Sequence, residues 1–465
     1  MNIRKLFAAK DMTQGAPWKR ILEFSVPMLL GNIVQQLYNT ADSVIVGLYV
    51  GDNALAAVGS AGPVMMILMA MFMGVSTGAG IIISQTFGAK DREGLSKGIG
   101  NCLILAAIVS VIGMIVGPLI TRPMLKLLST PESIMDMCAE YLIIFFLGFG
   151  GFCFYNILSG VLRGLGDSVS ALGFLVLTAV LNIILNLWFV AGFDMGVAGV
   201  SLATIISQFI SAFFCFRKLM TMSDAFDLNR KTVKFDKAVA GRIIKIGIPA
   251  GVTQMIMSMA NMLVQRLTNS MGETVIAANV MLMRVDGFAM MPNFSFGQAM
   301  SVFAGQNVGA RKYDRLGQGF KEGMVISVGT SIVLTGILLL TNSFLFGFFT
   351  TTPALIELAT GMMNIMAVGY ACVAITQVCG GVMRGAGDTV TPMWISIFTT
   401  IVLRLPIAYI MAYFTRSAEW PNGHPYSLSA SIVTAWVLGG VISVIAYRMG
   451  KWKKNIAVLA GQDQP

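Results

Sequence analysis

A single carboxylate within a long apolar stretch is the first feature of this sequence that could do chemistry. Asp42 follows Glu23 at a distance of nearly twenty residues, and no other acid lies between them. An ionised carboxylate inside a bilayer costs about 2.5–3.5 kcal/mol on insertion scales, so it persists where it faces the interior of a helix bundle. We therefore expect Asp42 to bind a cation, either H⁺ or Na⁺. A purely structural hydrogen-bond acceptor is the alternative.

Neutral oxygen-bearing side chains fall at the depth of Asp42 when the neighbouring apolar segments are placed antiparallel to one another. Asn182 and Asn186 are four residues apart and share one helix face. Tyr141 and Thr204 reach the same layer from adjacent segments. A carboxylate among neutral oxygens can accept a proton or ligate a hard cation such as Na⁺, and a helix–helix hydrogen bond is the alternative for each Asn. The predicted cation-coupling residues are Asp42, Tyr141, Asn182, Asn186 and Thr204, with Asn156 as a more distant member nearer the inner face.

Three further charged side chains, Arg284, Asp286 and Arg404, fall within apolar segments of the second half of the chain. Arg284 and Asp286 are two residues apart, a spacing that does not bring side chains face to face on a helix. Arg404 falls at a depth similar to that of Asp286. We expect Asp286 and Arg404 to form a buried structural or gating ion pair, and a role in ion coupling is the alternative.

Helices that cross a membrane must position these side chains. The chain has 465 residues, of which 56% are hydrophobic and 12% charged, about half the charge of a soluble domain. Stretches of about 20 residues without any charge, such as 102–121 and 172–193, are long enough to span a bilayer as helices. We predict an all-α integral membrane protein with twelve transmembrane helices. The predicted spans are 20–48, 54–84, 97–121, 133–160, 168–193, 195–216, 243–268, 274–305, 322–349, 354–382, 390–414 and 427–448.

Basic residues are confined to one side of this arrangement. The predicted outer loops contain only Arg122, Lys126 and Arg416 of the 32 Lys and Arg residues, and most of the others fall in the inner loops and tails. The positive-inside rule then places both termini in the cytoplasm, and it explains the net charge of +10 without a nucleic-acid partner. The six cysteines form no CxxC pair, so neither a disulfide framework nor a zinc site is predicted.

The sequence also resembles itself. Arg163 and Asp167 in GVLRGLGDS recur 221 positions later as Arg384 and Asp388 in GVMRGAGDT, and SQTFGAK at 84–90 recurs as GQNVGAR. Because the repeat contains six spans, an even number, the two halves have the same orientation and face a central cleft. The predicted organisation is a cytoplasmic tail 1–19, an N-terminal lobe 20–216, a basic cytoplasmic linker 217–242, a C-terminal lobe 243–448 and a cytoplasmic tail 449–465.

These motifs resemble the multidrug and toxic compound extrusion (MATE) family over nearly the whole chain. The segment FSVPMLLGNIVQQLYNTADSVIVG at 24–47, GQNVGA at 305–310 and the duplicated RGxGD[ST] carry the resemblance. It implies two six-helix lobes that export amphipathic, often cationic, compounds in exchange for H⁺ or Na⁺ by alternating access. Family members of this type often have an acid where Asn186 stands, so coupling through two acids is in doubt here.

The resemblance also implies which helices line the cleft between the lobes. The helices that carry the abundant methionines face the cleft in the family, and flexible thioethers suit a promiscuous binding surface. Core or lipid-facing packing is the alternative. The predicted cleft residues are Gln35, Met65, Met69, Met255, Met259, Met283 and Met290.

Two other functions compete with a cation-coupled drug exporter. The first is a lipid-linked oligosaccharide flippase of the same superfamily, although such relatives tend to have two extra helices and a strongly cationic cavity. The second is a membrane enzyme, which the lack of any Ser/His or Cys/His arrangement in the apolar segments disfavours. We expect no cofactor, no nucleic-acid partner and a monomer in a bacterial cytoplasmic (inner) membrane, with small amphipathic molecules and the lipid bilayer as partners.

Overall fold

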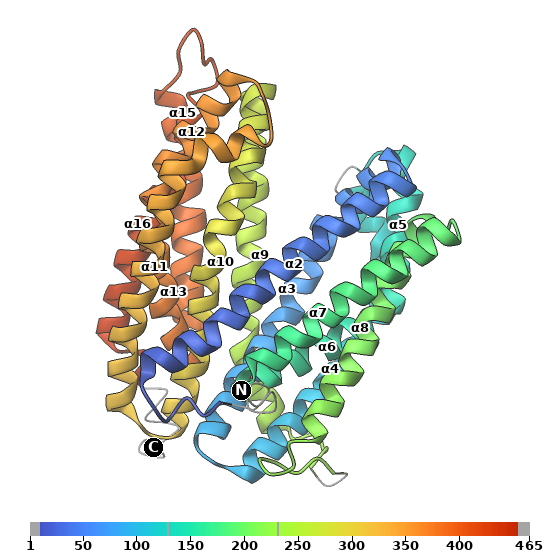
Figure 1. Ribbon diagram of the computed structural model, residues 1–465, viewed down its shortest axis with the longest axis vertical. Helices are drawn as coiled ribbons and strands as arrows, with labels where there is room; N and C mark the ends of the chain where they lie inside the picture. The colour runs from blue at the N-terminus through green and yellow to red at the C-terminus, as the bar shows by residue number, and fades with distance from the viewer. Residues whose placement is uncertain (1–9, 128–129, 230–231, 454–465) are drawn as a thin grey trace. The chain divides into compact units, whose positions relative to one another are not determined.

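The computed structural model describes residues 10–127, 130–229 and 232–453, and within these ranges it contains helices and no strands (Figure 1). Residues 1–9 and 454–465 of the predicted tails, and 230–231 of the predicted linker, lie outside the described residues. The all-α class predicted from the sequence is confirmed.

The helices of the first half follow one another through short connections. Their bounds are α2 Pro17–Tyr49, α3 Asp52–Gly88, α4 Arg92–Leu127, α5 Glu132–Leu147, α6 Phe149–Gly164, α7 Ser168–Asn186, the π-helix η1 Leu187–Gly192 and α8 Gly196–Met220. The helices of the second half are α9 Lys237–Ser270, α10 Glu273–Gly309, α11 Tyr313–Gly347, α12 Pro353–Ala367, α13 Tyr370–Gly385, α14 Val390–Ile397, the π-helix η2 Phe398–Arg404, α15 Leu405–Phe414 and α16 Tyr426–Met449.

The internal repeat of the sequence is also a repeat of the structure. The helix pair α5 and α6 is bent by 57° at Gly148, and the pair α12 and α13 is bent by 44° before Tyr370. Each bent pair occupies one predicted span, 133–160 in the first half and 354–382 in the second. The break therefore falls at equivalent positions of the two halves, as a duplicated chain requires.

The repeated RGxGD motif ends one helix and starts the next. Gly166 and Gly387 both have a positive φ, of 85° and 91°, which glycine adopts without a steric penalty. Asp167 then caps α7 by accepting a hydrogen bond from the Ser170 amide at 2.9 Å, and Asp388 accepts from the Thr391 amide at 3.0 Å. Both aspartates thus bond to the amide three residues ahead, and the motif is structural.

The described residues form two compact units. The first unit contains Val26–Gly251 together with the residues before Thr13, and the second contains Thr13–Ser25 and the chain from Val252 onward. These limits differ from the predicted lobes, which began at residues 20 and 243. The start of α2 packs within the second unit and the start of α9 within the first, an exchange that the apolar pattern alone does not reveal.

Each unit has its own buried apolar core. In the first unit α6 is buried on nearly all sides and packs against α3, α4 and α8. Its core includes Ile83, Ile99 and Leu162, and a separate phenylalanine cluster centres on Phe149. In the second unit α13 takes the equivalent central place against α10, α11 and α16, with Met363 and Tyr370 in its core.

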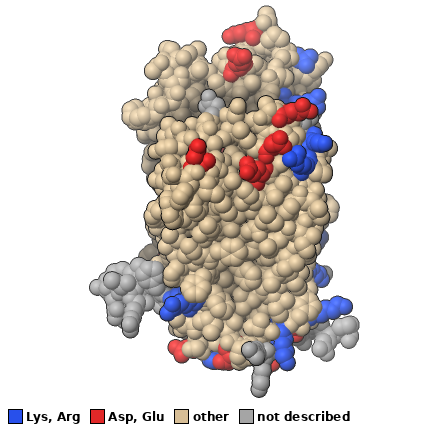
Figure 2. Space-filling model, turned by 90° about the vertical axis from the view of Figure 1, so that its right-hand side faces the viewer, with Lys and Arg blue, Asp and Glu red and all other residues tan. Residues whose placement is uncertain are grey.

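The exterior of the helices suits a bilayer. Eight helices of the described chain are long and apolar enough to cross a membrane, or up to ten when each bent pair is one span. Figure 2 shows a face whose charged side chains gather toward its two ends, with a broad uncharged zone between them. The protein is a multi-pass membrane protein, while the count of twelve spans stays a prediction.

Candidate functional site

Three helices of the first unit bring their polar side chains to one place. Asp42 comes from α2, Asn182 and Asn186 from the last turns of α7, and Thr204 from α8. The π-helix η1 begins directly after Asn186, and such segments are frequent at functional sites because they interrupt the regular helix spacing. Asn182 and Asn186 are fully buried, and Asp42 is half-buried.

A continuous chain of hydrogen bonds joins these side chains. Asn186 Nδ2 donates to Asp42 Oδ1 at 2.6 Å and to Asn182 Oδ1 at 2.8 Å, and Asn182 Nδ2 donates to the Thr204 hydroxyl at 3.1 Å. The spacing of four residues places both asparagines on the face of α7 that meets α2 and α8. The sequence-based prediction that Asp42, Asn182, Asn186 and Thr204 share one layer agrees with this geometry.

The orientation of the Asn182 amide is assigned from its hydrogen-bond partners. With its oxygen and nitrogen exchanged, Asn182 Nδ2 donates to Asp42 Oδ1 at 2.6 Å, and its oxygen accepts from the Thr204 amide at 3.2 Å and from the Thr204 hydroxyl at 3.1 Å. In this orientation Asn182 links Asp42 directly to Thr204.

The donor set also fits a hard monovalent cation. Asn186 Oδ1 is buried and has no hydrogen-bond partner, which leaves one amide oxygen available next to the carboxylate. Carboxylate, amide and hydroxyl oxygens are the ligands that hard cations such as Na⁺ take. Within the described chain no group of three or more His, Cys, Asp or Glu side chains could hold a metal ion.

Tyr38 is a member of this cluster that the sequence reasoning missed. Its hydroxyl lies beside Asp42 and Thr204, and its side chain is 8% exposed. Tyr38 lies four residues before Asp42 on α2, so the helical spacing that linked Asn182 to Asn186 could also have identified it.

Two of the predicted members contribute less than expected. Tyr141 is buried, and its backbone carbonyl accepts a hydrogen bond from Ser201, but among the described contacts its hydroxyl makes no hydrogen bond to Asp42. Asn156 lies outside the cluster, because its side-chain amide donates to the Phe152 carbonyl of its own helix at 2.8 Å. Its backbone carbonyl accepts a hydrogen bond from the Ser76 hydroxyl on α3. Asn156 thus joins helices, and its assignment to the coupling site is corrected.

Replacing Tyr38 by Phe is expected to change ion binding at Asp42 without unfolding the protein. The change keeps the buried ring and removes the hydroxyl beside Asp42, and a hydrogen bond to a charged carboxylate is worth about 1.5–3 kcal/mol. Because such a bond favours the ionised carboxylate, its loss should strengthen proton binding, and the H⁺ concentration that half-saturates proton-driven transport should fall by about 10- to 100-fold. Transport measured against ion concentration in proteoliposomes tests this. Tyr49→Phe is the matched control, since Tyr49 is an exposed tyrosine at the end of the same helix, and an equal effect of both changes would contradict the role of Tyr38.

The charges of the second unit do not form the ion pair expected from the sequence. The Tyr370 hydroxyl donates to Asp286 Oδ1 at 2.9 Å, while Arg404 Nη1 donates to Asn261 Oδ1 at 2.9 Å. No ion pair joins Asp286 to Arg404 in the described chain, although Asp286 lies within the electrostatic field of the guanidinium. Arg284, also expected to be buried, is exposed. Both expectations were wrong because depth along a helix does not determine which side chains meet.

The predicted cleft residues divide into three groups. Gln35, Met259 and Met283 are exposed, at 50% for Met259 and 39% for Met283, and Met255 is half-buried. Met65 and Met69 are half-buried and pack against the core of the first unit. Met290 is 8% exposed and belongs to the core of the second unit, so its burial argues against a place on a cleft surface.

A family model matches the chain twice, at residues 27–188 and 249–410. The matches together cover more than half of the sequence, and the second begins 222 residues after the first, in agreement with the repeat. The chain belongs to the MatE family. The resemblance stated from the sequence is thereby confirmed, and the protein is a transporter rather than an enzyme.

Relatives of this MatE protein cover nearly its whole length. It is 27% identical over 448 residues to the probable multidrug resistance protein YoeA of Bacillus subtilis, covering 94% of this chain and 95% of that protein. It is 24% identical to the probable multidrug resistance protein NorM of Thermotoga maritima, covering 94% and 93%. A structure described as the outward-facing conformation of a multidrug resistance MATE family transporter matches with a TM-score of 0.88 at 24% identity, over 96% and 99% of the two chains.

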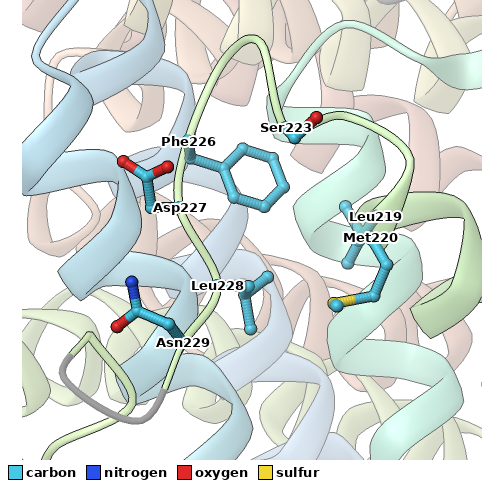
Figure 3. Close-up of a pocket in the computed structure, with 7 residues that line it drawn as sticks. All are labelled: Leu219, Met220, Ser223, Phe226, Asp227, Leu228 and Asn229. Atoms are coloured by element: carbon cyan, nitrogen blue, oxygen red, sulfur yellow. The ribbon is translucent and has the colours of Figure 1, made fainter.

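A surface pocket of this MatE chain lies apart from the polar cluster. Figure 3 shows it where α8 ends and the following loop begins. Its volume is about 290 Å³. Its lining residues are Leu219, Met220, Ser223, Phe226, Asp227, Leu228 and Asn229. None of the predicted coupling or cleft residues is among them, so the pocket is not the candidate site.

Proposed function

We propose that this protein is a secondary active antiporter that exports amphipathic, mostly cationic drugs or toxic compounds in exchange for H⁺ or Na⁺ by alternating access. The observation that carries the proposal is the Asp42 cluster. It is a lone carboxylate, half-buried among amide and hydroxyl groups in a chain of the MatE family. The names of several relatives, among them the multidrug export protein MepA of Staphylococcus aureus, support drugs as the class of exported compounds.

The cluster supports a role in ion coupling because it surrounds the Asp42 carboxylate with neutral amide and hydroxyl groups and no fixed positive charge. Asp42 Oδ1 accepts from Asn186 and, with the amide turned, from Asn182, so the groups that compete for this carboxylate are neutral donors that an ion can displace. A Na⁺ ion would use Asp42 and Asn186 Oδ1 as ligands. Either ion would be released when the cluster becomes accessible from the other side of the membrane.

We place the protein in the bacterial cytoplasmic membrane with both termini in the cytoplasm and expect it to act as a monomer without a cofactor. The basic inner loops support this orientation. The predicted outer loops contain few basic residues, so the positive-inside rule does not favour the opposite orientation.

Dye efflux from everted membrane vesicles tests the proposed function. Everted vesicles that contain the protein should take up a cationic dye from the medium when a pH gradient or a Na⁺ gradient is imposed. The gradient that drives uptake identifies the coupling ion. Vesicles without the protein are the control. Absence of dye movement under both gradients, together with binding of an undecaprenyl-linked sugar, would favour the flippase of the same superfamily over an exporter.

The exposed methionines of α9 and α10 are expected to set the range of substrates. Met259→Leu combined with Met283→Leu replaces two exposed polarizable side chains by less flexible ones of similar volume. The order of preference among several dyes should change by more than the summed activity falls. Met290→Leu, a buried core position, is the matched control and should leave the order unchanged. A uniform loss over all dyes would show that these methionines only support folding.

A further inference from the structure

The two halves of the chain exchange the starts of their first helices. Residues Thr13–Ser25, which include the start of α2, pack in the second unit, and the beginning of α9 as far as Gly251 packs in the first. In both helices the change of unit falls within three residues of a proline, Pro27 in α2 and Pro249 in α9. The start of each helix therefore packs in one unit, and the rest of the same helix packs in the other unit.

Polar side chains of α11 anchor the start of α2. Glu322 Oε2 accepts a hydrogen bond from the Trp18 amide at 2.8 Å, and this carboxylate also suits the positive end of the helix dipole. Lys312 Nζ donates to the Thr13 carbonyl at 2.9 Å, and Arg315 donates to two further carbonyls of the same segment at 2.6 and 3.0 Å. These bonds satisfy one amide in the first turn of α2 and three carbonyls of the residues that precede it.

The start of α9 is anchored in the same way from α4. Asn101 Oδ1 accepts from the Asp236 amide at 2.9 Å, and Asn101 Nδ2 donates to the Lys234 carbonyl at 3.3 Å. Asn101 and Glu322 are 221 positions apart and occupy equivalent places in the repeat. The same repeat position thus holds the N-terminal end of a long helix in both halves. It is an amide, Asn101, at the start of α9 and a carboxylate, Glu322, at the start of α2.

Apolar and backbone contacts reinforce each anchor. In α2 the side chains of Ile21 and Phe24 are fully buried within the second unit. In α9 a Cβ added at Gly247 would lie 2.7 Å from the Gly74 carbonyl oxygen, and one added at Gly74 would lie 2.5 Å from the Gly247 carbonyl oxygen. Helix backbones that touch through glycines leave no side chain able to rearrange, so separating them would open a gap between the helices.

The loop that connects α8 to α9 is also fastened within the first unit. Arg92 pairs with Asp227 at 2.8 Å, and this hydrogen bonding holds the pKa of Asp227 below its usual range. Figure 3 shows Phe226 and Asp227 pointing to opposite sides of the loop, and Phe226 is buried in the core. The loop that leads into α9 and the start of α9 are therefore both held within the first unit.

We propose that both exchanged helix starts stay anchored throughout the transport cycle, so that Thr13–Ser25 moves with the second unit and the start of α9 moves with the first. This inference rests on the proposed function, because it concerns how the two units change their arrangement. The required bending falls on α2 and α9 just beyond their anchors, where each proline lacks the amide that would complete the helix hydrogen bonding. Neither anchor opens to admit substrate.

Reversible cross-linking tests whether the anchors open. Trp18→Cys with Gln318→Cys spans the α2 anchor and keeps the Trp18 amide, while Lys97→Cys with Lys237→Cys spans the α9 anchor. Each double variant is joined by a flexible, reducible bismaleimide, with the two single variants as controls for reaction of native cysteines. Transport by the cross-linked protein in proteoliposomes should stay within twofold of that after reduction. A more than tenfold loss that reduction restores would overturn the proposal.

Hydrogen–deuterium exchange provides a readout that does not depend on transport. The amides of residues 13–25 should exchange equally slowly with and without a transported dye, and Glu322→Ala should accelerate their exchange by more than tenfold. Lys321→Ala, an exposed neighbour on α11, should not. Fast exchange of this segment in the wild-type protein when dye is added would contradict a permanent anchor. Failure of the wild-type protein to transport any dye would instead refute the proposed function and leave the exchange result interpretable.

Discussion

Replacing Asp42 by Asn is expected to abolish ion-driven export while the protein stays folded and inserted. Asn keeps the size of the side chain and can still hydrogen-bond to Asn186, Asn182 and Tyr38, but it cannot bind a proton or balance a cation. A gradient of one pH unit, or tenfold in Na⁺, stores about 1.4 kcal/mol for each exchanged ion, which supports about tenfold accumulation of substrate. The variant should accumulate none. Dye accumulation in vesicles under an imposed ion gradient measures this difference.

Glu140→Gln is the matched control for this prediction. Glu140 is an exposed acid of the same half of the chain, next to Tyr141, and its loss changes the net charge by the same amount. Export by this variant should equal that of the wild-type protein. If Asp42→Asn confers wild-type drug tolerance on cells at matched expression, Asp42 is a structural hydrogen-bond acceptor and the coupling site lies elsewhere.

Export of a monocationic dye is expected to be insensitive to the membrane potential, whereas export of a neutral compound should respond to it. Asp42 is the one carboxylate of the described cluster, and Asn186 beside it cannot carry a negative charge. One monovalent ion exchanged for one monocation moves no net charge, so the potential, worth about 2.3 kcal/mol per charge per 100 mV, has no effect. Proteoliposomes with the potential clamped by K⁺ and valinomycin provide the measurement.

Asn186→Asp sharpens this experiment because it places a second carboxylate against the first. If the added acid binds a second ion, export of the same monocation should become dependent on voltage. A strong voltage dependence in the wild-type protein would show that a second ion already moves. Asp286 would then be tested by substitution to Asn, since it is the other acid of the described chain set among apolar helices with a tyrosine hydroxyl as its partner.

Much of the fold could be predicted because the responsible forces act locally along the chain. Uncharged stretches identified the helices, since a bilayer excludes charge and requires backbone groups to be paired within each segment. The duplicated RGxGD motif predicted the repeat. The local structure of each copy follows from its residues, because Gly166 adopts a positive φ and Asp167 reaches an amide only three residues away. Asp42, Asn182, Asn186 and Thr204 could be brought to one layer because the rise of a helix converts residue number into depth.

Depth, however, does not specify direction or partner, and these features were decided by the tertiary structure alone. Asp286 and Arg404 share a depth but bond to Tyr370 and Asn261, because the rotation of each helix determines which side chains meet. Asn156 has the right chemistry, but its amide donates to the Phe152 carbonyl of its own helix instead of to Asp42. The exchanged helix starts leave no mark in the apolar pattern, because a segment buried in either unit needs the same residues. The sequence by itself therefore determined the helices, their repeat and the lone carboxylate, whereas packing between helices decided which side chains surround it and which unit holds each helix start.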